Sequence, residues 1–305
     1  MKIFYADHFV LPLPAGHRFP MSKYARLRER VHAELEGVEL CVPEPATDAE
    51  LLRVHAPDYV ERVVHGTLDA AQVRRIGFPW SPEMVERSRR SVGATLAAAR
   101  AAFTDAVSVN LAGGTHHAFA DRGEGFCVFN DVAVAVRAMQ AGGRACRFAV
   151  VDCDVHQGNG TAAIFDGDDD VFTFSVHGAS NFPFRKERST LDIALPDGAG
   201  DDAFLDAVRR GVDAAFGHAP ELVFYVAGAD AFAGDRLGRL DVSAAALAER
   251  DAIVFDACAA AGTPVAVSMA GGYAADVEDT VAIHHATVRA ARDHARRVSA
   301  TTTSR

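Results

Sequence analysis

The strongest constraint on the fold is a series of five short apolar runs that recur along the chain. They are AVSVNL (106–111), RFAVVD (147–152), VFTFSV (171–176), ELVFYVA (221–227) and TPVAVSM (263–269). Because they are apolar at nearly every position, they are typical of strands that are covered on both faces. The sequence therefore predicts a mostly parallel β-sheet flanked by helices.

Helical patterns lie between these runs. Ser81 and Ser243 can cap helices, and Gly217 can end one. Four helices are expected, over residues 82–103, 131–140, 201–217 and 243–261. Strands and helices that alternate in this way predict a single doubly wound α/β domain over residues 1–305. We expect a flexible tail from about residue 296 to 305.

The composition agrees with one globular domain and narrows the function. The chain has 305 residues, is 49% hydrophobic and carries a net charge of −10. This charge argues against nucleic acid as a partner and favours cationic substrates. The first residues hold only a short apolar run broken by prolines, which predicts neither a signal peptide nor a membrane span. Five scattered cysteines without a CxxC motif are typical of the reducing cytoplasm.

The predicted strands end in glycine-rich segments that carry polar side chains. In chain order these segments read AGGTHHA, DCDVHQGNG, SVHG, AGAD and AGGY. Ligands of such sheets bind outside the carboxyl ends of the strands. Glycine allows the tight turns and close approaches that converging side chains require. A functional site is therefore expected where the five segments meet.

Two carboxylates and an imidazole in these segments have the pattern of a metal site. Asp154 and His156 lie two positions apart, so an extended chain points both the same way, roughly 6.6 Å apart. Asp230, from another strand end, can supply a third ligand. Such a set is typical of catalytic zinc, although Fe(II), Co(II) and Mn(II) accept the same donors. Asp152, one step deeper in its strand, is expected to orient a histidine or to bind a monovalent cation.

Each feature also has an ordinary structural interpretation. A lone DxDxH segment is more often a solvated turn, and Asp230 can simply cap a turn. The pair His116–His117, or Tyr273 alone, can serve packing. The metal interpretation is favoured because four signals coincide at the strand ends. The histidines interpreted as structural are His17, His55, His177, His284 and His285.

With these motifs in place, the sequence resembles the histone deacetylase superfamily, within the arginase/deacetylase fold. The resemblance spans nearly the whole chain and includes HRFPMSKY (17–24), HAPDYV (55–60), GGTHHA, GEGFCVFND (123–131), DCDVHQGNG, GADAFAGDRLGRL (228–240) and AGGY. HQGNG together with GDRLGRL is most similar to the class IV branch and its bacterial relatives. The resemblance implies an active site at the carboxyl ends of the strands.

The resemblance also implies a role for each residue of the site. Asp154, His156 and Asp230 would bind Zn²⁺, with Fe²⁺ or Co²⁺ as possible substitutes. The catalytic residues would be His116, His117 and Tyr273, of which Tyr273 polarises the scissile carbonyl. The substrate tunnel would be lined by Gly125, Phe126, Phe182, Leu237, Gly271 and Gly272.

Supporting residues are implied around this set. Asp152 would bond to His116 and, with Ser175, form a K⁺ site. Asn159 would bond to His117, where class I enzymes have an aspartate, and a neutral amide leaves His117 the more readily neutral base. Many relatives hold the substrate backbone with an acidic loop residue, for which Asp69 is the nearest candidate.

The implied function is hydrolysis of an Nε-acyl-lysine, acetyl or longer, in a protein or peptide. One alternative is an acetylpolyamine or other small-molecule amide deacetylase, and another is a non-catalytic module that binds acyl-lysine. A ureohydrolase of the arginase type is disfavoured, because Phe232 stands where a second aspartate would follow Asp230.

Overall fold

A parallel β-sheet forms the centre of the protein, as seen in a computed structural model that describes residues 1–303 and the side chains of residues 1–300. Its eight strands follow the order β2-β1-β3-β8-β7-β4-β5-β6, and each neighbouring pair is parallel. The strands are Lys2–Phe4 (β1), Glu39–Cys41 (β2), Val107–Asn110 (β3), Phe148–Asp152 (β4), Val171–Gly178 (β5), Leu191–Leu195 (β6), Leu222–Val226 (β7) and Val265–Ser268 (β8).

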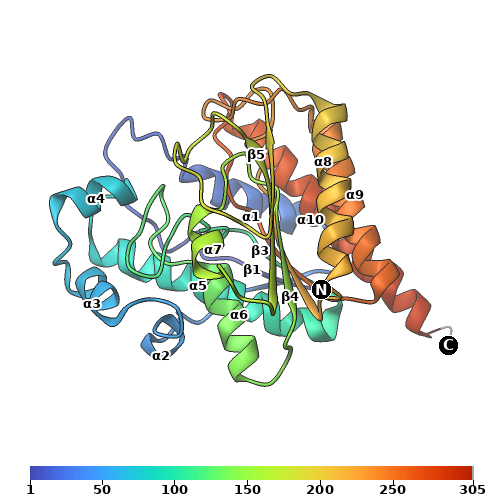
Figure 1. Cartoon of the computed structure of the whole chain (residues 1–305), viewed down its shortest axis with the longest axis horizontal. Coiled ribbons are helices and arrows are strands. Elements are labelled where there is room, and N and C mark those ends of the chain that lie inside the picture. Colours follow the sequence, from blue (N-terminus) through green and yellow to red (C-terminus); the bar gives the residue numbers. More distant parts are fainter. Residues whose placement is uncertain (304–305) are drawn as a thin grey trace.

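Helices account for most of the remaining described chain. They are Ser22–Glu34 (α1), Asp48–Leu51 (α2), Pro57–His65 (α3), Ala70–Ile76 (α4), Pro82–Asp105 (α5), Asp131–Ala141 (α6), Asn159–Ile164 (α7), Asp201–Gly217 (α8), Ala244–Ala261 (α9) and Val277–Thr303 (α10). Figure 1 shows α8 and α9 on one side of the sheet and α5 and α6 on the other.

Burial on both faces explains why the central strands are apolar at nearly every position. In β7, Val223 and Tyr225 belong to a core that includes residues of α1, α8, α9 and α10. Leu222, Phe224 and Val226 belong to a second core, with residues of α3, α5 and α6. Alternate side chains of one strand thus enter opposite layers. This arrangement confirms the predicted α/β sheet flanked by helices.

The predicted elements match the structure closely where the apolar run or helical pattern in the sequence was long. The five expected strands are β3, β4, β5, β7 and β8, and the four expected helices are α5, α6, α8 and α9. The Ser81 hydroxyl accepts a hydrogen bond from the Met84 amide at 3.1 Å, and Ser243 caps α9 through Ala246 at the same distance.

The sequence missed the outer strands β1, β2 and β6. The first two contain three residues each, and β6 is largely half-exposed at one edge of the sheet, so none shows a continuous apolar run. The segment expected to be a flexible tail is helical as far as Thr303, because α10 continues to that residue. Arg296 bonds to the Glu36 carbonyl and Arg297 to Asp256, which holds this last part of α10 against the domain. Residues 304–305 lie outside the described residues.

The strand order decides which loops meet. Strands β3, β8, β7, β4 and β5 are consecutive in the sheet although they are far apart in sequence. Because all run in parallel, their carboxyl ends lie along one edge, and the five glycine-rich segments follow them there. Among the described residues, no helix is long and apolar enough to cross a membrane. All five cysteines are free.

Candidate active site

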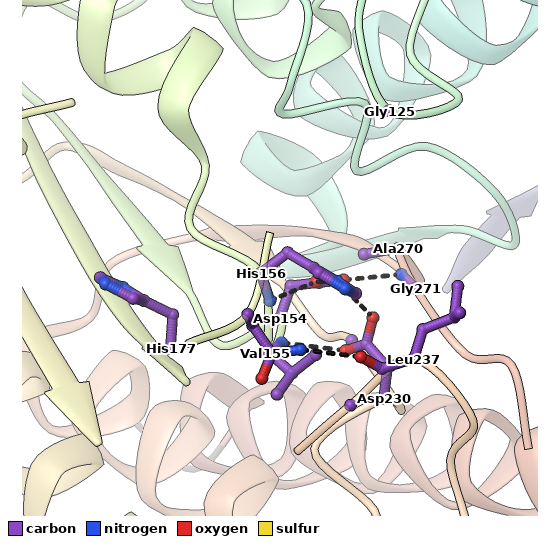
Figure 2. Close-up of polar contacts among 12 residues, drawn as sticks. Gly125, Asp154, Val155, His156, His177, Asp230, Leu237, Ala270 and Gly271 are labelled. Carbon is purple, nitrogen blue, oxygen red and sulfur yellow. Dashed lines mark hydrogen bonds and ion pairs between the residues drawn. The ribbon is translucent and has the colours of Figure 1, made fainter. Parts of the chain in front are cut away.

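Three side chains from two strand ends converge in the middle of this edge. One ligand atom from each of Asp154, His156 and Asp230 lies within 4.8 Å of the others. His156 Nδ1 is 3.0 Å from Asp154 Oδ1 and 3.1 Å from Asp230 Oδ2 (Figure 2). All three residues are at most 9% exposed. Two carboxylates and one imidazole with this spacing fit a divalent transition metal such as zinc.

The backbone around the triad fixes the direction of each carboxylate. The Gly271 amide donates to Asp154 Oδ2 at 2.8 Å, and the Val155 amide donates to Asp230 Oδ1 at 2.9 Å (Figure 2). A Cβ on Gly271 would lie 1.9 Å from Asp230 Oδ2, so only glycine fits at this position. The AGGY segment is therefore shaped around the two carboxylates.

Burial and the close approach of the charged groups shift the pKa values of the triad strongly. Burial beside Asp154 raises the pKa of Asp230 to about 7. Burial opposes a charged imidazole at His156, but the two carboxylates outweigh it and raise the pKa of His156 to about 10. Two buried carboxylates this close require a positive partner, which is the condition that a metal cation meets.

Two adjacent histidines lie beside the triad, and their pKa values are shifted in opposite directions. His116 Nδ1 is 2.6 Å from Asp152 Oδ2, and His117 Nδ1 is 2.7 Å from Asn159 Oδ1. Burial opposes charging of both rings. The carboxylates of Asp152 and Asp154 nevertheless raise the pKa of His116 to about 9. For His117, burial and the neighbouring imidazoles hold the pKa well below its usual value.

A buried aspartate anchors the loop that carries these histidines. Asp131, at the start of α6, accepts hydrogen bonds from the Gly114 amide at 3.0 Å and the Thr115 amide at 2.7 Å. Next to it, Asn130 caps α6 and donates to the Ala118 carbonyl. The FND end of the GEGFCVFND motif thus holds the THH segment, a role that the sequence analysis did not assign.

Asp152 and Ser175 face each other across neighbouring strands. They are partners in the register of β4 and β5, and both are buried. Asp152 Oδ1 also accepts from the Asp154 amide at 3.1 Å. The Ser175 hydroxyl is 3.0 Å from Nδ1 of His177, so this histidine packs beside the site.

The triad and the histidine pair form the floor of one cavity of about 830 Å³. Five of the six residues expected in the tunnel line it: Gly125, Phe126, Phe182, Leu237 and Gly271. The Phe182 ring lies edge-on to His117 with 4.9 Å between the ring centroids. Gly272 is the exception, because it does not line the cavity; a Cβ there would meet Thr280 and Ala229. Gly272 is therefore a packing residue and not part of the tunnel wall.

Tyr273 closes one side of the cavity and is held by groups that the sequence did not single out. Its amide donates to Asp235, and its carbonyl accepts from Arg236 Nε at 3.1 Å. The buried Lys23 donates to the carbonyls of Ala270 at 3.2 Å and Gly272 at 3.3 Å. Burial raises the pKa of the Tyr273 phenol well above its usual value, so the hydroxyl stays protonated.

Asp69, the nearest candidate for an acidic loop residue, lies away from the cavity. The Asp69 carboxylate accepts hydrogen bonds from the amides of Ala71 and Gln72 at 2.8 Å and caps α4, and the residue does not line the cavity. The cavity is instead lined by a set of arginines to which the sequence analysis assigns no role: Arg18, Arg74, Arg75, Arg87, Arg236 and Arg239. Since its only lining carboxylates among the described residues are Asp154 and Asp230, the local charge is opposite to that expected from the whole chain.

The other histidines that the sequence analysis interprets as structural lie in two kinds of environment. His17 lines the cavity, with Nε2 2.9 Å from the Gly77 carbonyl. His55 is buried between the Phe119 carbonyl and the Asn130 amide. His284 and His285 lie within α10 and are buried.

Comparison with known proteins identifies the family. A model of the histone deacetylase domain matches residues 17–289. The chain is 44% identical over 294 residues to an uncharacterized protein of Picosynechococcus, covering 95% of this chain and 98% of that one. It is 34% identical to a histone deacetylase-like amidohydrolase of Pseudomonas aeruginosa, covering 86% and 74% of the two chains.

Solved structures agree on the fold. A histone deacetylase homologue from Aquifex aeolicus superimposes with a TM-score of 0.81 at 24% identity, covering 97% of this chain and 87% of the other. A homologue complexed with SAHA has a TM-score of 0.79 at 25% identity, covering 97% and 88%. The chain therefore belongs to the histone deacetylase family of amide hydrolases.

Proposed function

We propose that this protein is a zinc-dependent hydrolase of Nε-acyl-lysine in proteins or peptides. The observation that carries the proposal is the meeting of three groups on one cavity floor: the Asp154–His156–Asp230 triad, the His116–His117 pair and Tyr273. The free cysteines support a reducing compartment, the cytoplasm, as its location.

The metal ligands in this proposal are Asp154, His156 and Asp230, with Fe²⁺ or Co²⁺ as possible substitutes for Zn²⁺. A cation held by these residues would supply the positive charge that polarises a substrate carbonyl and that lowers the pKa of water to about 7. The three side chains are already held in place by backbone amides and by one another, so little reorganisation accompanies binding.

His117 is the general base in this scheme. Its Nδ1 faces the Asn159 amide oxygen and so carries the hydrogen, which leaves Nε2 to accept a proton from water. Its depressed pKa keeps it neutral and ready for that step. The proton then passes to the leaving lysine amine, and such positioned transfer contributes typically about 10²–10⁴-fold. His116, held as a cation by Asp152, is the electrostatic partner.

Tyr273 serves as the hydrogen-bond donor to the carbonyl oxygen as negative charge develops there. The protonated phenol suits this role. Phe126 and Phe182 form apolar walls for the methylene chain of the lysine. A K⁺ ion beside Asp152 and Ser175 would stabilise the base of the site.

The test is hydrolysis of a peptide panel that carries acetyl-, trifluoroacetyl-, octanoyl- and myristoyl-lysine, plus acetylspermidine. The protein is loaded with zinc and assayed with and without a hydroxamate chelator. We expect chelator-sensitive turnover of at least one lysine peptide, and the best acyl length reports the depth of the tunnel. Turnover of acetylspermidine alone would indicate a polyamine deacetylase in place of the proposed function. Absence of hydrolysis of every substrate despite bound zinc would favour a non-catalytic binding module.

A further inference from the structure

Five exposed arginines surround the open end of the cavity, and we call this set the arginine rim. Its members are Arg18, Arg74, Arg75, Arg236 and Arg239. They come from three separate segments: the loop before α1, the last turn of α4, and the loop after β7. The rim is thus assembled by the fold and not by one basic stretch of sequence.

Most members of the arginine rim form no ion pair among the described residues. Arg239 pairs with Asp197 at 3.2 Å. For the other four, no carboxylate lies within 4.0 Å in the part of the chain that the structure describes. The two acidic residues that line the cavity, Asp154 and Asp230, lie buried at its floor, where the proposed divalent cation would balance their charge. A ligand that approaches the mouth therefore meets a positive surface on a protein whose net charge is −10.

An aromatic side chain completes the mouth. Phe184 also lines the cavity and is 87% exposed, the highest value among the large hydrophobic residues that protrude from the surface. Its ring lies 6.5 Å from that of Phe182, which continues into the tunnel. The mouth thus offers an apolar surface beside guanidinium donors, which suits a peptide chain with acidic side chains.

We propose that the arginine rim selects acyl-lysines that are flanked by acidic residues and disfavours polycationic substrates such as acetylated polyamines. This inference rests on the proposed deacylase function and names its substrate class. Complementary charge at a cavity mouth raises the rate of encounter, by about tenfold or more at low ionic strength. Like charge suppresses the wrong partner in the same way.

The experiment compares three peptides that share one acyl-lysine and differ only in the four flanking residues, which are all Asp, all Ala or all Arg. Both kcat/KM and the Kd of fluorescent versions are measured at about 0.02 M salt and at about 1 M salt, where the Debye length is near 3 Å. We expect kcat/KM to be about tenfold higher for the acidic than for the basic peptide at low salt. At high salt the difference should nearly disappear.

A matched pair of variants separates the rim from net charge. Arg74→Glu/Arg75→Glu reverses two members of the rim. Arg53→Glu/Arg144→Glu makes the same change in net charge at two exposed arginines that do not line the cavity. The rim variant should lose or invert the preference, whereas the control variant should keep the order of the wild type.

The outcomes distinguish this inference from the deacylase function on which it rests. Hydrolysis of all three peptides at equal rates, or an unchanged order in the rim variant, would overturn the role of the arginine rim and leave the deacylase intact. Absence of hydrolysis with the acidic peptide still bound most tightly would support the rim and overturn the deacylase function. A preference for the basic peptide would contradict the inference directly.

Discussion

The floor and the mouth of the cavity are built in opposite ways. On the floor, Asp154, His156 and Asp230 are buried and bonded to backbone amides and to one another. At the mouth, the arginine rim is exposed, and four of its five members have no carboxylate within 4.0 Å among the described residues. The floor is thus suited to chemistry that demands fixed geometry, and the mouth to a choice among substrates by charge.

The largest expected effect comes from removing a ligand on the floor. Asp230→Ala leaves Asp154 and His156 without their third partner, so we expect loss of bound metal and a fall in activity well beyond the roughly 10–100-fold typical of outer partners. Metal content and kcat/KM are measured together. Asp69→Asn is the control, because this carboxylate only caps α4. An Asp230→Ala protein that retains one metal ion and normal turnover would contradict the assignment of the triad.

The next effect concerns the tyrosine beside the floor. Tyr273→Phe removes one donor to the developing oxyanion, which typically costs roughly 2.7–4 kcal/mol, so kcat should fall at least about a hundredfold. Tyr24→Phe is the control, since Tyr24 also lines the cavity and both tyrosines are 8% exposed. Equal effects of the two substitutions on kcat, or loss of metal from Tyr273→Phe, would remove Tyr273 from the proposed mechanism.

The stability of the protein should depend on pH through His55, which contacts Asn130 beneath the histidine-bearing loop. His55 accepts at Nε2 from the Asn130 amide and bonds at Nδ1 to the Phe119 carbonyl, an arrangement that requires the neutral ring. Burial lowers the pKa of His55 to about 4 from the ordinary value of 6.5. The contribution of His55 to the free energy of unfolding is therefore complete above pH 6.5, and it falls by about 3 kcal/mol as the pH decreases toward 4.

The measurement for His55 is the free energy of unfolding as a function of pH. The wild type should lose stability more steeply than His55→Gln between pH 6.5 and pH 4, because glutamine does not titrate. Parallel curves for the two proteins would show that His55 does not titrate with folding. Other buried histidines contribute equally to both curves, so the difference reports His55 alone.

The smallest effect is expected at the mouth. Phe184 is 87% exposed, so Phe184→Ser should leave stability unchanged and raise KM for a peptide by about threefold, without a change in kcat. Val10→Ser is the control, because Val10 is 59% exposed and does not line the cavity. A large fall in kcat for Phe184→Ser would contradict the assignment of chemistry to the floor and substrate binding to the mouth.

The same contrast explains what the sequence could and could not predict. The floor was predictable because buried polar residues need partners and glycines, and these requirements leave recognisable segments such as DCDVHQGNG and AGGY at the strand ends. Asp154 and Asp230 are 76 positions apart in a sequence that marks both, and the parallel strand order brings them together.

The mouth was not predictable for the converse reason. An exposed arginine needs no partner, so nothing in the sequence marks Arg18, Arg75 and Arg236 as neighbours, and only the folded chain shows that they surround one opening. The net charge of −10 was misleading here, because it averages over a surface on which the cavity differs in sign. Gly272 was assigned to the tunnel from its place in AGGY, yet its backbone turns it toward Thr280.

The most direct test of the central claim is a stoichiometric metal titration of the apoprotein. Protein stripped with chelator is titrated with Zn²⁺ while hydrolysis of an acyl-lysine peptide is followed. We expect no turnover without metal, then a linear rise, and a plateau at one equivalent of Zn²⁺ that Asp230→Ala does not show. Turnover by the stripped protein, or zinc binding at one equivalent that leaves every acyl-lysine peptide intact, would contradict this claim.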